Sequence, residues 1–186
     1  MMQMLVAGGI PVLTDDLRKP DADNPRGYYE FERAKAIRTD RAWLAIAEGK
    51  VVKMVHLLLL DLPLDEGGAA GAGARRYDII FMRREAHEVV RSQSVMLARS
   101  GKPGGAIAPE QLIAVYERQI ARVLGFLAGS AAARVLEVSY NELIREPAAT
   151  ARGIAAFLGG EDGRSMDIAA MAGAVDPTLY RNRAGA

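Results

Sequence analysis

The stretch YDIIFMRREAHEVVRS, residues 77–92, is the part of the sequence that decides the fold. Residues 77–82 carry aromatic and β-branched side chains, which favour a buried strand. Arg83 and Arg84 follow directly, and residues 85–100 have the pattern of a helix. A strand that passes through two arginines into a helix is typical of a protein built on a parallel α/β sheet.

Strands and helices alternate along the rest of the chain as well. Further short strands are predicted at residues 10–13, 50–60 and 134–138. Helices are predicted at residues 1–6, 40–48, 109–127, 147–158 and 165–175. This order predicts the α/β fold class: a three-layer parallel sheet with flanking helices on both faces, in one domain over residues 1–186.

The composition is typical of a globular protein and excludes several kinds of site. The 186 residues carry 24 Lys and Arg against 23 Asp and Glu, a net charge of +1, which argues against a nucleic-acid coat or a membrane-surface protein. The absence of cysteine excludes disulfides and thiolate metal sites and is compatible with the cytoplasm. Two histidines are too few for a multi-histidine metal centre. The longest apolar stretch, residues 54–60, is too short to span a membrane.

Parallel sheets bind ligands beyond the carboxyl ends of their strands, which directs attention to Arg83 and Arg84. The planar guanidinium group can donate two hydrogen bonds to one phosphate, and the helix that follows adds backbone N–H donors. Ser92 follows Arg84 by about two helical turns and could contribute a hydroxyl. The same pattern also fits a solvated arginine pair and an ordinary helical serine, so both interpretations stay open at this stage.

Residues 84–92, REAHEVVRS, resemble the 3′-phosphate-binding segment of sulfotransferases, whose usual form is Arg-x-Pro-x-Asp-Val-x-x-Ser. Arg84, Val89 and Ser92 match in register, while Glu88 replaces the Asp. Alanine stands in place of the usual proline at position 86. In that family the Arg and the Ser hold the 3′-phosphate of 3′-phosphoadenosine 5′-phosphosulfate (PAPS), so the resemblance implies that Arg84 and Ser92 bind this nucleotide, with Arg83 beside them.

Other stretches in the same order extend the resemblance along the chain. Residues 135–147 and 154–159 are similar to the late strand, the Tyr-Glu-Asp-Leu turn and the Phe-Leu-Gly helix stop of the family. Residues 24–30, NPRGYYE, look like a segment of a bacterial sulfotransferase subgroup. The resemblance implies a P-loop nucleotide-hydrolase-like fold, a cytoplasmic bacterial enzyme, PAPS as donor, and a small-molecule, glycan or lipid acceptor.

The sequence departs from the family at its start. Sulfotransferases open with a strand and a phosphosulfate loop resembling Gly-x-Pro-Arg-Ser-Gly-Thr, and no such loop occurs in the 186 residues. We therefore expect the first strand of the sheet to be missing, the gene product to begin upstream of Met1, and turnover by this chain to be impaired. A non-catalytic nucleotide-binding relative is the alternative. Sheet edges left exposed by the missing strand would allow the chain to oligomerise.

The resemblance also suggests catalytic groups and a closing segment. Glu30 ends the bacterial segment and is the first candidate base. His56 is the second, with Lys53 as a clamp on the donor, although the Lys-x-x-His spacing would put the two on opposite faces of a strand. Arg181 and Arg183 resemble the basic C-terminal segment that closes over the nucleotide.

Two further features of the sequence concern an acceptor pocket and the alternative of a kinase-like enzyme. The side chains that could line an acceptor pocket, or equally belong to the core, are Tyr28, Tyr29, Phe31 and Trp43. A nucleoside kinase-like enzyme would need a Gly-Lys-Ser/Thr loop, which the sequence lacks. We expect no metal site.

Overall fold

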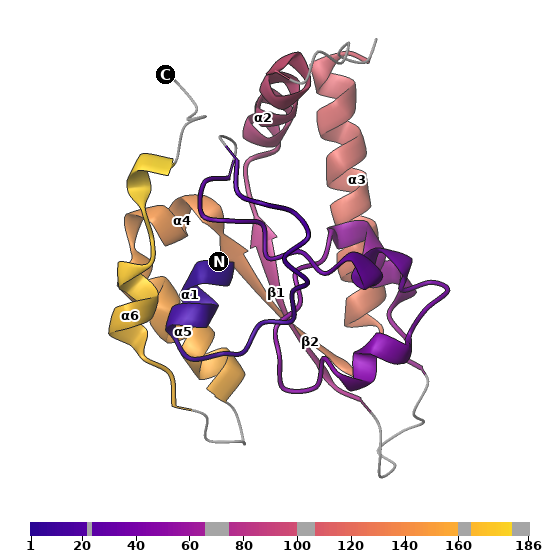
Figure 1. The fold of residues 1–186 in the computed structure, drawn as a ribbon. Helices are drawn as coiled ribbons and strands as arrows, with labels where there is room; N and C mark the ends of the chain where they lie inside the picture. Colours follow the sequence, from indigo (N-terminus) through magenta and orange to yellow (C-terminus); the bar gives the residue numbers. More distant parts are fainter. Residues whose placement is uncertain (22–23, 66–74, 100–106, 160–164, 180–186) are drawn as a thin grey trace.

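A parallel two-stranded sheet lies at the centre of the computed structural model, which describes residues 1–21, 24–65, 75–99, 107–159 and 165–179 (Figure 1). Strand β1 spans Tyr77–Arg83 and strand β2 spans Ala133–Ser139, paired in register from end to end. Both strands were predicted at these places from their apolar runs. The fold is mixed α/β, but a larger sheet is not present in the described ranges.

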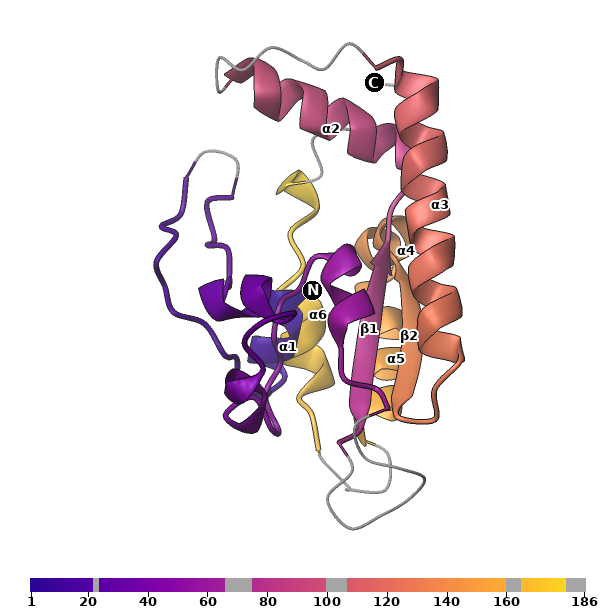
Figure 2. The ribbon, with the colours of Figure 1, turned by 90° about the vertical axis from the view of Figure 1, so that its right-hand side faces the viewer.

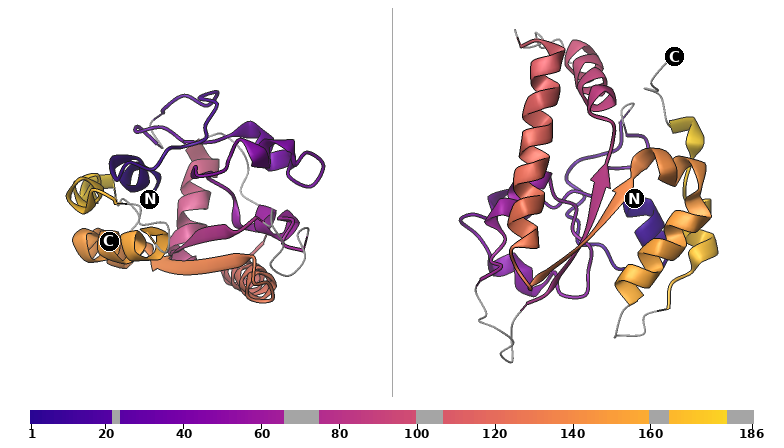
Figure 3. Two further views of the ribbon diagram at one scale, coloured as in Figure 1. Left: turned by 90° about the horizontal axis from the view of Figure 1, so that it is seen from below. Right: turned by 180° about the vertical axis from the view of Figure 1, so that it is seen from behind.

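Helices cover both faces of the sheet, as Figures 1 and 3 show. The helix α3, Pro109–Ala128, packs on one face. The helices α1 (Met2–Ala7), α5 (Pro147–Gly159) and α6 (Ile168–Gly173) pack on the other. Side chains of a strand point alternately to its two faces, so each strand contributes to both layers of the core.

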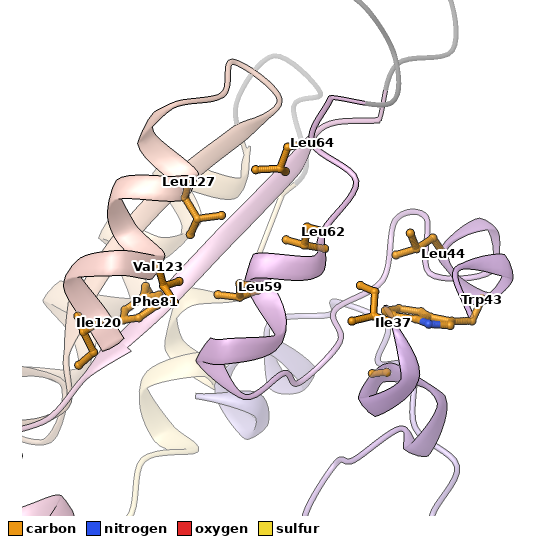
Figure 4. Close-up of a cluster of buried hydrophobic side chains, with 11 residues drawn as sticks. Ile37, Trp43, Leu44, Leu59, Leu62, Leu64, Phe81, Ile120, Val123 and Leu127 are labelled. Atoms are coloured by element: carbon orange, nitrogen blue, oxygen red, sulfur yellow. The ribbon is translucent and has the colours of Figure 1, made fainter. Parts of the chain in front are cut away.

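The first core cluster joins α3 to β1 and to the N-terminal half of the chain (Figure 4). Phe81 of β1 meets the apolar face of α3, where Ile120, Val123 and Leu127 are buried. Leu59 packs against the same face. The helical spacing in α3 therefore produces the buried stripe that the sequence predicts.

The second core cluster lies on the opposite face of the sheet. Val138 of β2 packs there with Met4 of α1, Ile154 of α5 and Met171 of α6. A short helix between β2 and α5, α4 (Tyr140–Arg145), adds Leu143; it was expected only as a turn. The Ser139 side chain accepts a hydrogen bond from the Glu142 N–H and so caps this helix.

The helix α2, Ala86–Arg99, leaves the carboxyl end of β1 and packs against α3 (Figure 2). The predicted helix at residues 85–100 is therefore present over nearly its whole length. A final 3₁₀ turn, η4, spans Pro177–Leu179. Within the described ranges, none of the helices combines the length and apolarity that crossing a membrane requires.

The N-terminal half differs most from expectation. The predicted strand at residues 50–60 is wrong: residues 50–55 form one bridge, Val12 to Val51, and no strand, and His56–Asp61 form the 3₁₀ helix η3. The predicted strand at residues 10–13 is reduced to that same bridge. Two more 3₁₀ helices occur, η1 (Glu32–Ala36) and η2 (Ala42–Ala45), the second inside the helix predicted for residues 40–48.

Candidate functional site

The carboxyl ends of β1 and β2 border a small pocket, the arginine pocket, of about 240 Å³. Its wall comprises Arg83, Arg84, Glu85, Ala86, Tyr116, Glu117, Ile120, Ser139 and Asn141. Arg83 ends β1 and Arg84 follows it, Ser139 ends β2, Asn141 lies in α4 (Tyr140–Arg145), and Tyr116 comes from α3. As expected for a parallel sheet, a pocket lies at the carboxyl ends of the strands, and two arginines line it.

Arg84 makes contacts to two other elements. Its Nε lies 2.9 Å from Oε2 of Glu88, one turn into α2, and its guanidinium group stands 5.0 Å from the centre of the Tyr140 ring. The side chain of Arg84 is 24% exposed, whereas that of Glu88 is 1% exposed. Arg84 thus pairs with the buried Glu88 carboxylate, contacts the Tyr140 ring of α4, and lines the arginine pocket.

Arg83 is more exposed than Arg84 and is bound differently. Its Nη1 lies 2.8 Å from Oε2 of Glu137 on the neighbouring strand β2. Both partners are accessible to water, so this pair adds little to stability. Arg83 could exchange Glu137 for an anion at small cost.

Two tyrosines near the arginines are partly withdrawn from water. Burial raises the pKa of Tyr140, and the nearby Arg84 charge opposes the rise. Burial likewise raises the pKa of Tyr116, opposed by Arg83 and Arg84. Both phenols are therefore neutral at pH 7, where they can act as hydrogen-bond donors.

Ser92 is placed less favourably than the resemblance implies. It lies about two turns into α2, half-buried, and no hydrogen bond joins it to Arg84 within the described part of the chain. It does not line the arginine pocket. Arg83 and Arg84 are brought together at the pocket, and Ser92 is not.

A second, larger cavity of about 1450 Å³ is lined by residues of β1 and of the N-terminal half of the chain. Residues 49–56 line one part of this cavity, and residues 77–82 of β1 line another. The Tyr77 N–H bonds toward β2, so by alternation the main-chain groups of Asp78, Ile80 and Met82 point toward this cavity. The edge of the sheet is therefore open here.

Met1, which carries the α-amino group, also lines this large cavity. Burial lowers the pKa of this ammonium group. The described wall thus combines apolar side chains with an open strand edge.

His56 lines the large cavity at the start of η3 and rests on α3. Its Nε2 lies 3.3 Å from Oε1 of Gln119, and its ring meets Tyr116 edge to face at 5.6 Å. Tyr116 borders both the large cavity and the arginine pocket. The phenol ring of Tyr116 therefore connects His56 to the arginines, a relation that helical spacing alone does not reveal.

Glu30 and Lys53 are neighbours in an ion-pair network. The Glu30 carboxylate lies 3.3 Å from Arg18, 3.6 Å from Lys53 and 3.6 Å from Lys35. Lys53 also donates a 2.9 Å hydrogen bond to the carbonyl oxygen of Tyr28. Lys53 lines the large cavity, and Glu30 stands beside its wall rather than on it.

The four aromatic residues divide between core and cavity. Trp43 is buried, packs edge to face with Phe31 at 5.7 Å, and its indole N–H has no hydrogen-bond partner among the described residues. Tyr28 and Tyr29 line the large cavity, Tyr29 with a left-handed φ of 52°. Trp43 lines it as well, but from within the first core cluster.

Arg181 and Arg183 lie outside the described residues. In the described ranges, no group of three or more acidic or histidine side chains could hold a metal ion. Glu88, Tyr116, Tyr140 and Asn141 were not recognised as site residues from the sequence. Glu88 does occupy the Asp position of the resembling motif, which was the available signal.

Comparison with known families gives a match over less than half of the chain. Residues 76–162 match a model of the sulfotransferase family. The sulfotransferase match begins at β1 and ends just beyond α5, so it contains both strands and every residue that lines the arginine pocket. It supports the family resemblance of residues 84–92 and 135–159, and sulfuryl transfer in general. Residues 24–30 lie outside the sulfotransferase match. No curated protein and no solved structure matches the chain significantly.

Proposed function

We propose that this chain binds PAPS with its 3′-phosphate at the arginine pocket and passes the sulfuryl group to a hydroxyl or amine of an acceptor. The observation that carries this proposal is the position of Arg83 and Arg84. They belong to the sulfotransferase match and line a pocket at the carboxyl ends of two parallel strands. Both the family and the geometry point to the same two side chains.

The arginine pocket suits one phosphate group rather than a whole nucleotide. Its volume of about 240 Å³ is below the ~300–1,000 Å³ usual for drug-sized ligands. Two guanidinium groups, the Asn141 amide and the Ser139 hydroxyl supply donors at its wall. These residues would hold the 3′-phosphate, and the rest of the nucleotide would extend beyond the pocket.

The bound nucleotide would supply the activated sulfuryl group, and the chain's own residues would position the acceptor and take its proton. His56 faces the large cavity, where an acceptor can enter. When Gln119 Oε1 accepts from the Nε2–H of His56, Nδ1 is the basic nitrogen and can receive the acceptor proton. Tyr116 lies between this imidazole and the arginines.

Glu30 is the alternative base, and Lys53 the accompanying cation. The three cations around Glu30 tie it into the loop network, and its carboxylate does not line the cavity. This arrangement favours His56 over Glu30 as the proton acceptor. Lys53, which does line the cavity, could contact an anionic group there.

Turnover by the 186 residues alone is proposed to be slow. They contain no loop resembling Gly-x-Pro-Arg-Ser-Gly-Thr to hold the phosphosulfate. A non-catalytic relative that only binds the nucleotide is the second candidate, and the same absence favours it. The two candidates share the arginine pocket and differ in whether sulfuryl transfer follows binding.

A calorimetric titration with adenosine 3′,5′-bisphosphate, run beside AMP, tests the proposal. A 3′-phosphate that meets charged donors should bind at least about tenfold more tightly than a ligand without one. Equal binding of the two nucleotides, or none by a folded sample, would contradict it. Release of the bisphosphate from PAPS then separates the candidates: turnover near ~1 per second would overturn the proposed impairment.

A further inference from the structure

Glu88 is the one buried charged side chain among the described residues, which makes it unusual in this chain. A carboxylate withdrawn from water is costly unless a cation and hydrogen bonds compensate it. Glu88 lies in the first turn of α2, where an acidic residue is ordinarily exposed to water. Its burial therefore calls for an explanation beyond helix capping.

Arg84, a partner of Glu88, supplies that explanation. Arg84 approaches it through Nε at 2.9 Å, and the Tyr140 ring covers the guanidinium group at 5.0 Å. One contact engages the Nε edge of the guanidinium group, and the other is a cation–π contact over the Tyr140 ring. Two such contacts restrict how Arg84 is turned, and Arg84 borders the arginine pocket.

We propose that Glu88 is a positioning residue that sets the orientation of the Arg84 guanidinium group toward an anion in the arginine pocket. Bidentate binding of a phosphate requires the guanidinium plane to be correctly turned. The side chain of an arginine held at one edge loses less freedom on binding than an unrestrained one. The inference rests on the proposed function, because the anion is the 3′-phosphate of the nucleotide.

Three variants test the inference by their preference for adenosine 3′,5′-bisphosphate over AMP. Glu88→Met has similar length but no acceptor, so the preference should fall about tenfold. Glu88→Gln keeps an oxygen for the Arg84 Nε–H and should retain most of the preference. Glu110→Met removes the same charge from the exposed first turn of α3 and should change nothing.

The ratio of the two affinities separates positioning from a merely structural role. Loss of stability alone would weaken both nucleotides together and leave their ratio unchanged. A folded Glu88→Met protein that keeps the parent's ratio within about twofold would overturn the inference. If that variant does not fold, Glu88→Leu offers a second apolar side chain without an acceptor, and an unchanged ratio there would overturn the inference equally.

Nucleotide binding by the parent protein distinguishes a failure of the proposed function from a failure of the proposed role of Glu88. A parent without any preference for the bisphosphate contradicts the proposed function itself. A parent with a clear preference that Glu88→Met retains contradicts only the role of Glu88. A preference lost in Glu88→Met and kept in Glu88→Gln supports both.

Discussion

Arg84 has two tasks at the residue scale, because it compensates a buried carboxylate and borders the arginine pocket. A binding defect after its replacement would therefore mix lost contacts with lost stability. Measuring the free energy of unfolding without ligand separates the loss of stability from the loss of ligand contacts. Removing one partner of a buried pair leaves the other charge uncompensated, whereas removing both does not.

We predict that Arg84→Met lowers the free energy of unfolding by about 3–5 kcal/mol, because it removes the cation that lies 2.9 Å from the buried Glu88 carboxylate. The double variant Arg84→Met/Glu88→Met should recover most of that loss. Urea unfolding followed by circular dichroism measures both.

The exposed pair Arg83–Glu137 provides the control for this prediction. Arg83→Met should cost less than about 1 kcal/mol, since both partners remain accessible to water. Equal losses at Arg83 and Arg84 would show that the burial of Glu88 has no energetic consequence.

The sequence allowed only part of this residue-scale arrangement to be predicted. Arg83 and Arg84 could be placed at a ligand site because a strand and a helix meet there. The burial of Glu88 could not, because acidic residues in a first helical turn are usually solvated. The contact between His56 and Tyr116 depends on how η3 packs on α3, which no local pattern encodes.

At the scale of elements, the apolar run in residues 50–61 was predicted as a strand but forms a bridge followed by η3. Val51, Val52 and Val55 favour extended backbone; Val51 does form a bridge, and Val55 does have extended backbone angles. The following leucines have no such preference, and the chain turns into η3, where Leu59 packs on α3. A short apolar run cannot be assigned to strand or helix by periodicity alone.

Two glycines permit a matched test of element packing. A Cβ added at Gly8, just after α1, would stand 2.7 Å from Cγ and 2.8 Å from Sδ of buried Met171 in α6. Gly8→Ala should therefore lower the free energy of unfolding by about 1–3 kcal/mol through overpacking between α1 and α6. Chemical denaturation measures the change.

Gly125 is the control, because it lies exposed within α3 and a Cβ there meets nothing within 4 Å. Gly125→Ala should raise stability by about 0.5–1 kcal/mol through better helix propensity. If Gly8→Ala were also neutral or stabilising, α1 would not be tightly packed against α6.

At the scale of the whole molecule, the sheet is small for the helices that it carries. Two strands separate the two core clusters, and one edge of β1 faces the large cavity instead of a neighbour. Sheets generally need three or more strands, or helices packed on them, to be stable. Here the helices on both faces supply that support, and the order of elements in the sequence could not reveal how few strands pair.

The open edge of β1 leads to a last prediction. A strand-forming segment about as long as β1, joined ahead of Met1 through a glycine-serine linker, should enter the large cavity and pair with Asp78, Ile80 and Met82. The pairing would satisfy main-chain groups and cover apolar side chains, so Tm should rise by about 5 °C or more. The same segment with prolines at alternate positions cannot form the ladder and should leave Tm near that of the parent. Equal melting temperatures for the two fusions would mean that the cavity does not accept a strand, and calorimetry with adenosine 3′,5′-bisphosphate would show whether filling it strengthens nucleotide binding.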